Sequence, residues 1–238
     1  MSKWRKYNGA LIPNIPPDEN IDVSNVDDLI HEKKVYFARW VSDFDCNKKT
    51  QFWFVINDTP VSIADYSRNT RSKIRRGLKK CIVREITKQE LIDKGYPTYV
   101  SALESYSKKH EIISLEDFNK QISSMGSEWD LWGIFYQNLL IGYSQNKIIG
   151  DYCDYSTIKF HPNYLKFYPS YALFYTMNNF YLNQKGFRFV NDGARSISHE
   201  TNIQNFLIDK FKFRKAYCRM HVRYSFKMSI VIRLLYFF

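Results

Sequence analysis

The sequence predicts a mixed α/β protein in which a central, mostly antiparallel sheet is flanked by helices. The chain has 238 residues, of which 45% are hydrophobic and 25% charged, which are values typical of a globular fold. Several helical patterns carry visible caps, and a run of short strands follows them in the second half of the chain. Helices followed by a meander and then by alternating helix and strand indicate one layered α/β domain over residues 1–238.

The first half of the chain is expected to alternate short strands with capped helices. Residues 1–30 are rich in Pro and Asp and are predicted to form an irregular arm. The capping residues expected to start helices are Ser67, Thr87 and Ser114. A stop at Gly95 and a new start at Pro97 divide the second helical stretch into two helices. The strands of this half are expected at 35–41, 51–56 and 81–86.

The second half is expected to begin with an antiparallel meander. Its strands are predicted at 131–136, 139–143 and 147–155, with a turn at Ser144–Asn146. A fourth strand lies either in 156–160 or in 163–167, on one side or the other of Pro162. A helix over 170–183, a strand over 187–190 and a helix capped by Thr201 follow. Residues 213–224 form either a strand pair or one long strand.

Charge and cysteine content narrow the class of protein. The formal net charge is +11, which favours phosphate-bearing or polyanionic ligands or simply a solvated basic surface. A helix starting at Ser67 concentrates seven cationic side chains, namely Arg68, Arg71, Lys73, Arg75, Arg76, Lys79 and Lys80. The four cysteines lack the spacing of a zinc site or a secreted disulfide framework, so we expect no metal and a cytoplasmic location.

The apolar residues 225–238 are too short to span a membrane and are interrupted by Arg233. They are expected to form a helix or tail that docks on the domain, with a weak interfacial anchor as the alternative. We therefore expect no membrane span.

Two segments place polar residues where a helix begins, and they are the candidate sites. The first is Tyr168-Pro-Ser-Tyr-Ala172, where the unpaired N–H groups of a helix N-terminus suit a phosphate. The second is 192–201, which follows a strand at the sheet edge where α/β proteins bind ligands. His199 is a candidate general base here, and the alternative is a structural loop histidine hydrogen-bonded to backbone or to Asp192.

The run from Leu131 to Arg219 resembles the GNAT superfamily of N-acyltransferases, in a branch associated with cell-envelope and polysaccharide biosynthesis. The resemblance rests on the meander, on the Tyr168–Ala172 turn into a helix, and on the closing segment Asn202–Tyr217. The basic segment Arg71–Lys80 is similar to one that Fem-type aminoacyl transferases carry. Tyr168–Ala172 lacks the glycines of the family's phosphate loop. Ile208 stands near the position where the family has a Tyr that acts as general acid, and Ile cannot donate a proton. Another donor or a loss of activity is therefore an alternative.

The resemblance implies direct attack of an acceptor amine on an acyl donor, with acyl-CoA as the donor substrate. We expect His199 as the base, oriented by Asp192, with substrate held by Arg195, Ser196 and Asp154. The donor is expected to contact Tyr168, Ser170, Tyr171 and Ala172. The acceptor is expected to be an amine of a sugar or cell-envelope precursor. The alternatives are Fem-type transfer from aminoacyl-tRNA, with the basic helix contacting phosphates, and a non-catalytic module that binds a polyanion.

Overall fold

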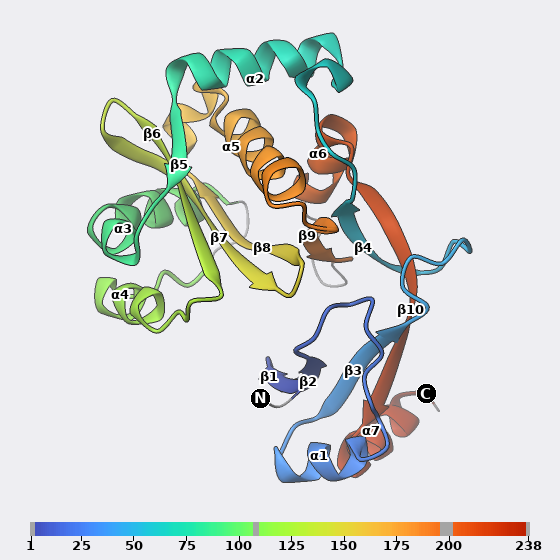
Figure 1. Cartoon of the computed structure of the whole chain (residues 1–238). Coiled ribbons are helices and arrows are strands. Elements are labelled where there is room, and N and C mark those ends of the chain that lie inside the picture. The colour runs from blue at the N-terminus through green and yellow to red at the C-terminus, as the bar shows by residue number, and fades with distance from the viewer. Residues whose placement is uncertain (1–2, 107–109, 196–201, 237–238) are drawn as a thin grey trace. The chain divides into compact units, whose positions relative to one another are not determined.

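The computed structural model describes residues 3–106, 110–195 and 202–236, and its chain divides into two compact units. Unit 1 consists of Met1–Phe54 and Lys215–Phe238, and unit 2 of Val55–Arg214. Figure 1 shows the course of the chain through both. This division does not test the expectation of a single domain, which stays a prediction.

The mixed α+β class and the mostly antiparallel sheet are confirmed. The strands are β1 (Trp4–Tyr7), β2 (Ala10–Pro13), β3 (Phe37–Ser42), β4 (Phe52–Asn57), β5 (Ile82–Glu85), β6 (Trp129–Tyr136), β7 (Leu139–Ile149), β8 (Tyr152–Phe160), β9 (Phe189–Ala194) and β10 (Arg214–Tyr224). The α-helices are α1 (Val26–Glu32), α2 (Arg68–Lys80), α3 (Lys88–Glu104), α4 (Leu115–Ser123), α5 (Pro169–Asn178), α6 (Asn202–Phe211) and α7 (Phe226–Tyr236). Of the strand pairs whose register is described, five are antiparallel, whereas β2–β3 and β8–β9 are parallel.

Unit 1 is built from segments that are far apart in the sequence. β3 pairs with β10 so that Ser42 lies opposite Arg219 and Phe37 opposite Tyr224. The expectation of an irregular arm is wrong, because β1 and β2 form a hairpin and α1 follows it. The hairpin turns at Asn8 and Gly9, whose φ angles of 46° and 76° are those that an Asn-Gly turn favours.

The sheet of unit 2 runs in the order β9-β8-β7-β6-β5, and helices cover both of its faces (Figure 1). α3 and α4 cover one face through a cluster that includes Leu91, Phe118 and Ile122. α5 lies on the other face, where Ala172 packs against Ile134 and Ile141. The meander and β9 therefore share one sheet with the helix after Tyr168 packed on it, as the sequence predicts.

The predicted turn at Ser144–Asn146 is wrong, because these residues lie inside the long strand β7. All three are buried, although all three are polar. Ser144 Oγ donates to Asn146 Oδ1 at 2.5 Å, and Asn146 Nδ2 donates to the hydroxyl of Tyr181 at 3.2 Å. Ser144 and Asn146, which are typical of turns, are retained in a buried strand here because their side chains find hydrogen-bond partners. The chain turns instead at Gly150 and Asp151, and 156–160 is the correct choice for the next strand.

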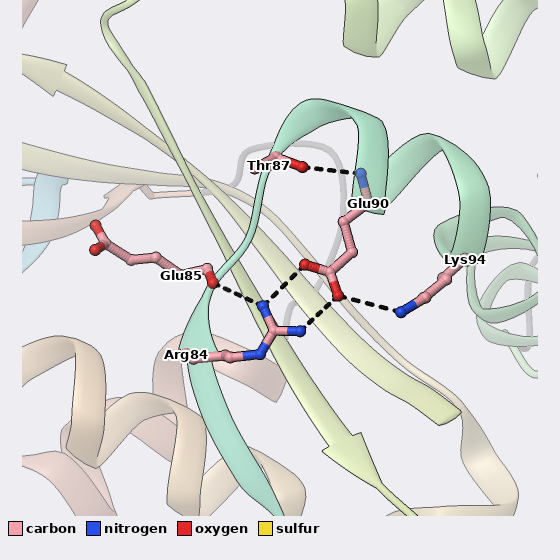
Figure 2. Close-up of polar contacts among 5 residues, drawn as sticks. All are labelled: Arg84, Glu85, Thr87, Glu90 and Lys94. Carbon is pink, nitrogen blue, oxygen red and sulfur yellow. Dashed lines mark hydrogen bonds and ion pairs between the residues drawn. The ribbon is translucent and has the colours of Figure 1, made fainter. Parts of the chain in front are cut away.

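The helix predicted to end at Gly95 continues through Pro97 as α3. Its buried residues Leu91, Thr98 and Ala102 lie on one face, and their packing outweighs the local stop signals. The cap is confirmed, since Thr87 Oγ1 accepts a hydrogen bond from the Glu90 backbone at 3.1 Å. The Glu90 carboxylate, however, binds Arg84 and Lys94 (Figure 2). The two guanidinium contacts are 2.8 and 2.5 Å, and the Lys94 contact is 3.2 Å.

Other helix boundaries follow the sequence more closely. The caps predicted at Ser67 and Ser114 are confirmed by hydrogen bonds from Thr70 N and Asp117 N. α5 continues as a π-helical segment over Asn179–Gln184 before the chain turns at Gly186. Residues 214–224 form one long strand, β10. No helix in the described ranges is long and apolar enough to cross a bilayer.

Candidate functional site

The N-terminus of α5 lies where the sequence predicts a phosphate-binding turn. A 3₁₀ segment, Pro162–Phe167, leads into Tyr168, which adopts the left-handed conformation with φ 59° and ψ 42°. Pro169 then begins the helix, where its missing N–H leaves no intrahelical bond unmade. Tyr168 and Ser170 are half-buried, whereas Tyr171 and Ala172 are buried. Of the four residues predicted to contact the donor, Tyr168 and Ser170 are thus the more accessible.

Helix α2 lies directly against this turn and brings positive charge to it. Gly77 makes the close approach, because a Cβ built on it would lie 2.7 Å from the Tyr168 carbonyl oxygen and 3.1 Å from Ala172 Cβ. Lys73 Nζ is 5.8 Å from the ring centre of Tyr168 and 5.2 Å from that of Tyr171. The guanidinium of Arg76 lies 4.7 Å from the Tyr168 ring. We call Lys73, Arg76, Tyr168 and Tyr171 the cationic–tyrosine cluster.

The cationic side chains of this cluster are available to a ligand. Among the residues that the structure describes, neither Lys73 nor Arg76 forms an ion pair with a carboxylate. Lys73 Nζ has one polar contact, at 3.5 Å, with the hydroxyl of Tyr171. Two uncompensated cations at a helix N-terminus form a site whose electrostatics favour an anion.

Asp154 lies on β8 where the pairing with β9 stops. The parallel ladder joins Tyr152–Asp154 to Phe189–Asn191. Asn191 Nδ2 donates to Asp154 Oδ1 at 3.0 Å, and Ser156 Oγ donates to Asp154 Oδ2 at 3.3 Å. Tyr155 points toward α5, because its hydroxyl donates to Asn178 at 2.8 Å. Side chains alternate along a strand, so Asp154 points to the opposite face, which α3 and α4 cover. A register shift between Tyr155 and Thr157 then turns Thr157 and Lys159 to that same face.

Asp192 follows Asn191 on β9, next to the strand that carries Asp154. Burial of the carboxyl, and secondarily the Asp154 carboxylate, raise the pKa of Asp192 well above its usual range. Its backbone carbonyl accepts a hydrogen bond from Gln204 of α6 at 3.5 Å, which ties the strand end to that helix. A carboxyl with a raised pKa is a better proton acceptor than an ordinary surface carboxylate.

A cavity of about 320 Å³ opens on the α3/α4 side of the sheet. Thr157 and Lys159 of β8 line it, and they follow Asp154 on the same strand. Its polar lining also includes His110, Glu111, Gln121 and Gln145. Phe118, Ile122 and Tyr143 provide apolar surface. The volume and the few polar groups suit part of a small molecule.

The structure brings together Asp154 and Asp192 on neighbouring strands, and Tyr168, Ser170, Tyr171 and Ala172 at one helix end. Arg195 is exposed just after β9. Ser196 and His199 lie outside the described residues, so their predicted roles stay predictions.

Sequence reasoning missed the residues of the cavity. His110, Glu111 and Lys159 belong to a loop and a strand, with no motif spacing among them. The helical signals on both sides of the loop place His110 and Glu111 between two helices. They do not indicate that these residues line a cavity. Across the described ranges, no group of three or more His, Cys, Asp or Glu side chains is arranged to hold a metal ion.

No family model matches the chain, and no curated protein is significantly similar to it in sequence. Solved structures resemble it in fold. FemX matches with a TM-score of 0.66 at 11% identity, covering 97% of this chain and 85% of that one. The C-terminal domain of a putative lysylphosphatidylglycerol synthetase from Agrobacterium fabrum gives 0.57 at 9% identity, covering 97% and 83%. L-PGS from Bacillus licheniformis gives 0.54 at 10% identity, covering 97% and 84%.

Proposed function

We propose, from the premise that the chain has a GNAT-like fold of the Fem type, that it is an acyltransferase. It moves an acyl group from a phosphate-bearing donor to an amino group of an acceptor. The observation that carries this proposal is the cationic–tyrosine cluster at the N-terminus of α5, on the sheet that also carries Asp154 and Asp192. The fold supports the class of reaction, and the cluster supports a phosphate on the donor.

The donor we favour is acyl-CoA. Lys73 and Arg76 would neutralise its pyrophosphate, and the free N–H groups at the start of α5 would bind phosphate oxygens. The turn Tyr168–Ala172 contains no glycine, and its positive charge comes from α2, which Gly77 allows to approach the turn closely. Lys73 and Arg76 lie beside Tyr168 because of this approach.

The acceptor would bind in the cavity on the α3/α4 face. Its polar groups, which include Glu111, Gln145 and Thr157, offer hydrogen-bond acceptors to an amine and partners to hydroxyl groups. A sugar or cell-envelope precursor fits this lining. Asp154 points to the same face and would hold the acceptor near the end of the β8–β9 ladder.

The reaction needs a group that takes the proton from the attacking amine. We assign His199 as that base, with Asp192 supporting the imidazolium that forms. The amine attacks the acyl carbonyl, the bond to the donor sulfur breaks, and the amine proton leaves through the base.

Fem-type transfer from aminoacyl-tRNA is the second candidate. α2 carries seven Lys and Arg side chains in thirteen residues and no Asp or Glu, which is more charge than one pyrophosphate needs. Five of the seven lie outside the cationic–tyrosine cluster, and they are Arg68, Arg71, Arg75, Lys79 and Lys80. A nucleic-acid backbone would contact these five cationic side chains as well. A non-catalytic module that binds a polyanion would use the same face.

Calorimetric titration with coenzyme A, acetyl-CoA and charged tRNA distinguishes the candidates. The double variant Lys73→Gln/Arg76→Gln should weaken coenzyme A binding about tenfold or more, because two charge-assisted contacts are lost. The matched control Lys79→Gln/Lys80→Gln, on the same helix but outside the cluster, should leave coenzyme A affinity unchanged. If both double variants weaken tRNA binding equally and coenzyme A does not bind, the acyl-CoA donor is wrong. Polyanion binding without acyl transfer from either donor supports the non-catalytic module.

A further inference from the structure

Helix α7 of unit 1 carries an apolar face that is largely exposed. The helix is fixed at its start, where Ser225 N donates to the Tyr36 carbonyl at 2.9 Å and Ser225 Oγ accepts from Met228 N at 3.4 Å. Beyond that turn, none of its described side chains is buried. The helix therefore leaves most of its apolar side chains accessible.

The exposed side chains share one side of the helix. Phe226 is 81% exposed and Leu235 is 72% exposed, and the others are Ile230, Val231 and Leu234, at 46–57%. Their spacing places all five on one half of the helical circumference, whereas Met228, Ser229 and Ile232 are half-buried on the other. Two exposed tyrosines, Tyr36 and Tyr224, lie at the strand ends beside the start of the helix. A continuous apolar surface of this kind indicates an interaction site.

The helix itself carries charge of one sign. Residues 225–238 contain Lys227 and Arg233 and no Asp or Glu. On the preceding strand, Arg219 and Arg223 are paired with Asp43 and Asp27, so they do not add to this charge. Lys227 lies in the middle of the exposed face, where its long stem can remain apolar while its ammonium group reaches outward. Arg233 lies at the border of the same face.

We propose that the exposed face of α7 binds the surface of an anionic lipid membrane. The five apolar side chains would enter the boundary between headgroups and acyl chains, with the helix axis parallel to the surface. Lys227 and Arg233 would pair with lipid phosphates, and Tyr36 and Tyr224 would lie at headgroup depth. The chain would therefore be held on a membrane by a helix that lies in the membrane surface.

Charge complementarity favours a lipid surface over a second copy of this chain. A two-fold pairing along α7 would place Lys227 and Arg233 of one copy against the same cations of the other, with no acid in 225–238 to compensate them. An anionic bilayer would bury the apolar face and pair both cations with lipid phosphates.

Flotation of the full chain with lipid vesicles tests this proposal. The protein should bind vesicles of phosphatidylcholine that contain phosphatidylglycerol. Leu234→Glu/Leu235→Glu should weaken this binding about a hundredfold, because two apolar side chains lose their burial and two negative charges face the lipid. Lys227→Gln/Arg233→Gln should weaken it about thirtyfold on the anionic vesicles only.

Leu115→Glu is the matched control, since Leu115 is an exposed leucine on α4 of unit 2. It should bind like the natural chain, and all variants should keep the same Tm. If the natural chain binds vesicles of phosphatidylcholine alone as tightly as vesicles that contain phosphatidylglycerol, the electrostatic part of the proposal is wrong. The whole proposal fails if the leucine variant binds vesicles normally. It also fails if that variant converts a dimer of the natural chain into a monomer and neither protein binds vesicles, because the occupant is then a second copy.

Discussion

The carbonyl oxygen of Tyr168 lies 2.7 Å from the position that a Cβ on Gly77 would occupy. This contact sets the distance between α2 and the N-terminus of α5, and so the positions of Lys73 and Arg76 above Tyr168. The geometry of this cluster therefore depends on a residue without a side chain, which lies on the helix packed against the turn and not in the turn itself.

Gly77→Ala tests that dependence. Alanine is the better helix former by about 1 kcal/mol, so an isolated helix would gain stability. Here the added methyl meets backbone that cannot move aside, and we expect a net loss of about 1–3 kcal/mol by denaturant unfolding. Ser72→Ala, at an exposed position of the same helix, is the control and should not lower stability. A Gly77→Ala variant as stable as the natural chain would show that α2 and α5 are not closely packed.

Asp192→Asn should separate catalysis from stability. Loss of the carboxylate should lower kcat by about 10²–10⁴-fold with little change in donor affinity, if Asp192 supports the base. His199→Ala should give a loss in the same range. The control Asp209→Asn, at an exposed position of α6, should leave kcat unchanged.

The stability of the Asp192 variant should depend on pH with a defined sign. The pKa of Asp192 is raised on folding, so the ionised carboxyl costs stability above the pKa of the unfolded chain. Asp192→Asn should therefore melt at or above the natural Tm at neutral pH. The Tm values of the natural chain and the variant should become equal as the pH falls toward about 4, where Asp192 is protonated in the unfolded chain as well. A variant that melts lower at neutral pH contradicts this account.

Tyr181→Phe tests the buried hydrogen bonds beneath the sheet. The hydroxyl accepts from Trp132 Nε1 at 2.9 Å and from Asn146 Nδ2 at 3.2 Å, and it donates to Asp130 at 3.1 Å. Its removal leaves buried donors unpaired, at a cost of about 1–3 kcal/mol. Tyr136→Phe, on a half-buried tyrosine whose ring stacks on Phe167, should cost much less. Equal Tm values for the two variants would count against the network.

Glu90→Gln should lower the Tm at neutral pH, and this Tm difference should disappear at low pH. Hydrogen bonds and charge from Arg84, and secondarily from Lys94, lower the pKa of Glu90 to about 2. A pKa depressed on folding gives stability that is complete above the unfolded value of about 4.3 and is lost as the pH falls through about 2. The Tm difference between the natural chain and Glu90→Gln should therefore shrink across that window. A difference that stays constant with pH would show that the ion pairs do not contribute.

Local signals predicted much of the fold because they act over a few residues. The caps at Ser67, Thr87 and Ser114 each bond a backbone N–H three residues ahead, and the sequence shows them directly. The Asn8-Gly9 turn was equally visible, and the hairpin was missed because the Pro and Asp content of the arm outweighed it. Local preferences could not predict β7, since Ser144 and Asn146 are tolerated in a buried strand only through Tyr181, which is distant in the sequence.

The candidate site was predicted in part for the same reason. Residues on consecutive positions, such as those at the start of α5, were found from one helix signal. Lys73 and Arg76 were visible as charges, but their position over Tyr168 depends on how two helices pack. The cavity lining brings together His110 of a loop and Lys159 of β8, and no sequence spacing encodes that proximity.

The pairing of β3 with β10 has a consequence for how the chain folds. Ser42 and Arg219 are joined across the whole of unit 2, whose residues run without interruption from Val55 to Arg214. Closing so long a loop is entropically slow, whereas unit 2 needs only its own segment. During synthesis, unit 2 can fold while the partner of β3 is still absent, and unit 1 must wait for β10. Helix α7, which follows β10 in the sequence, would then be put in place after unit 2 has already formed.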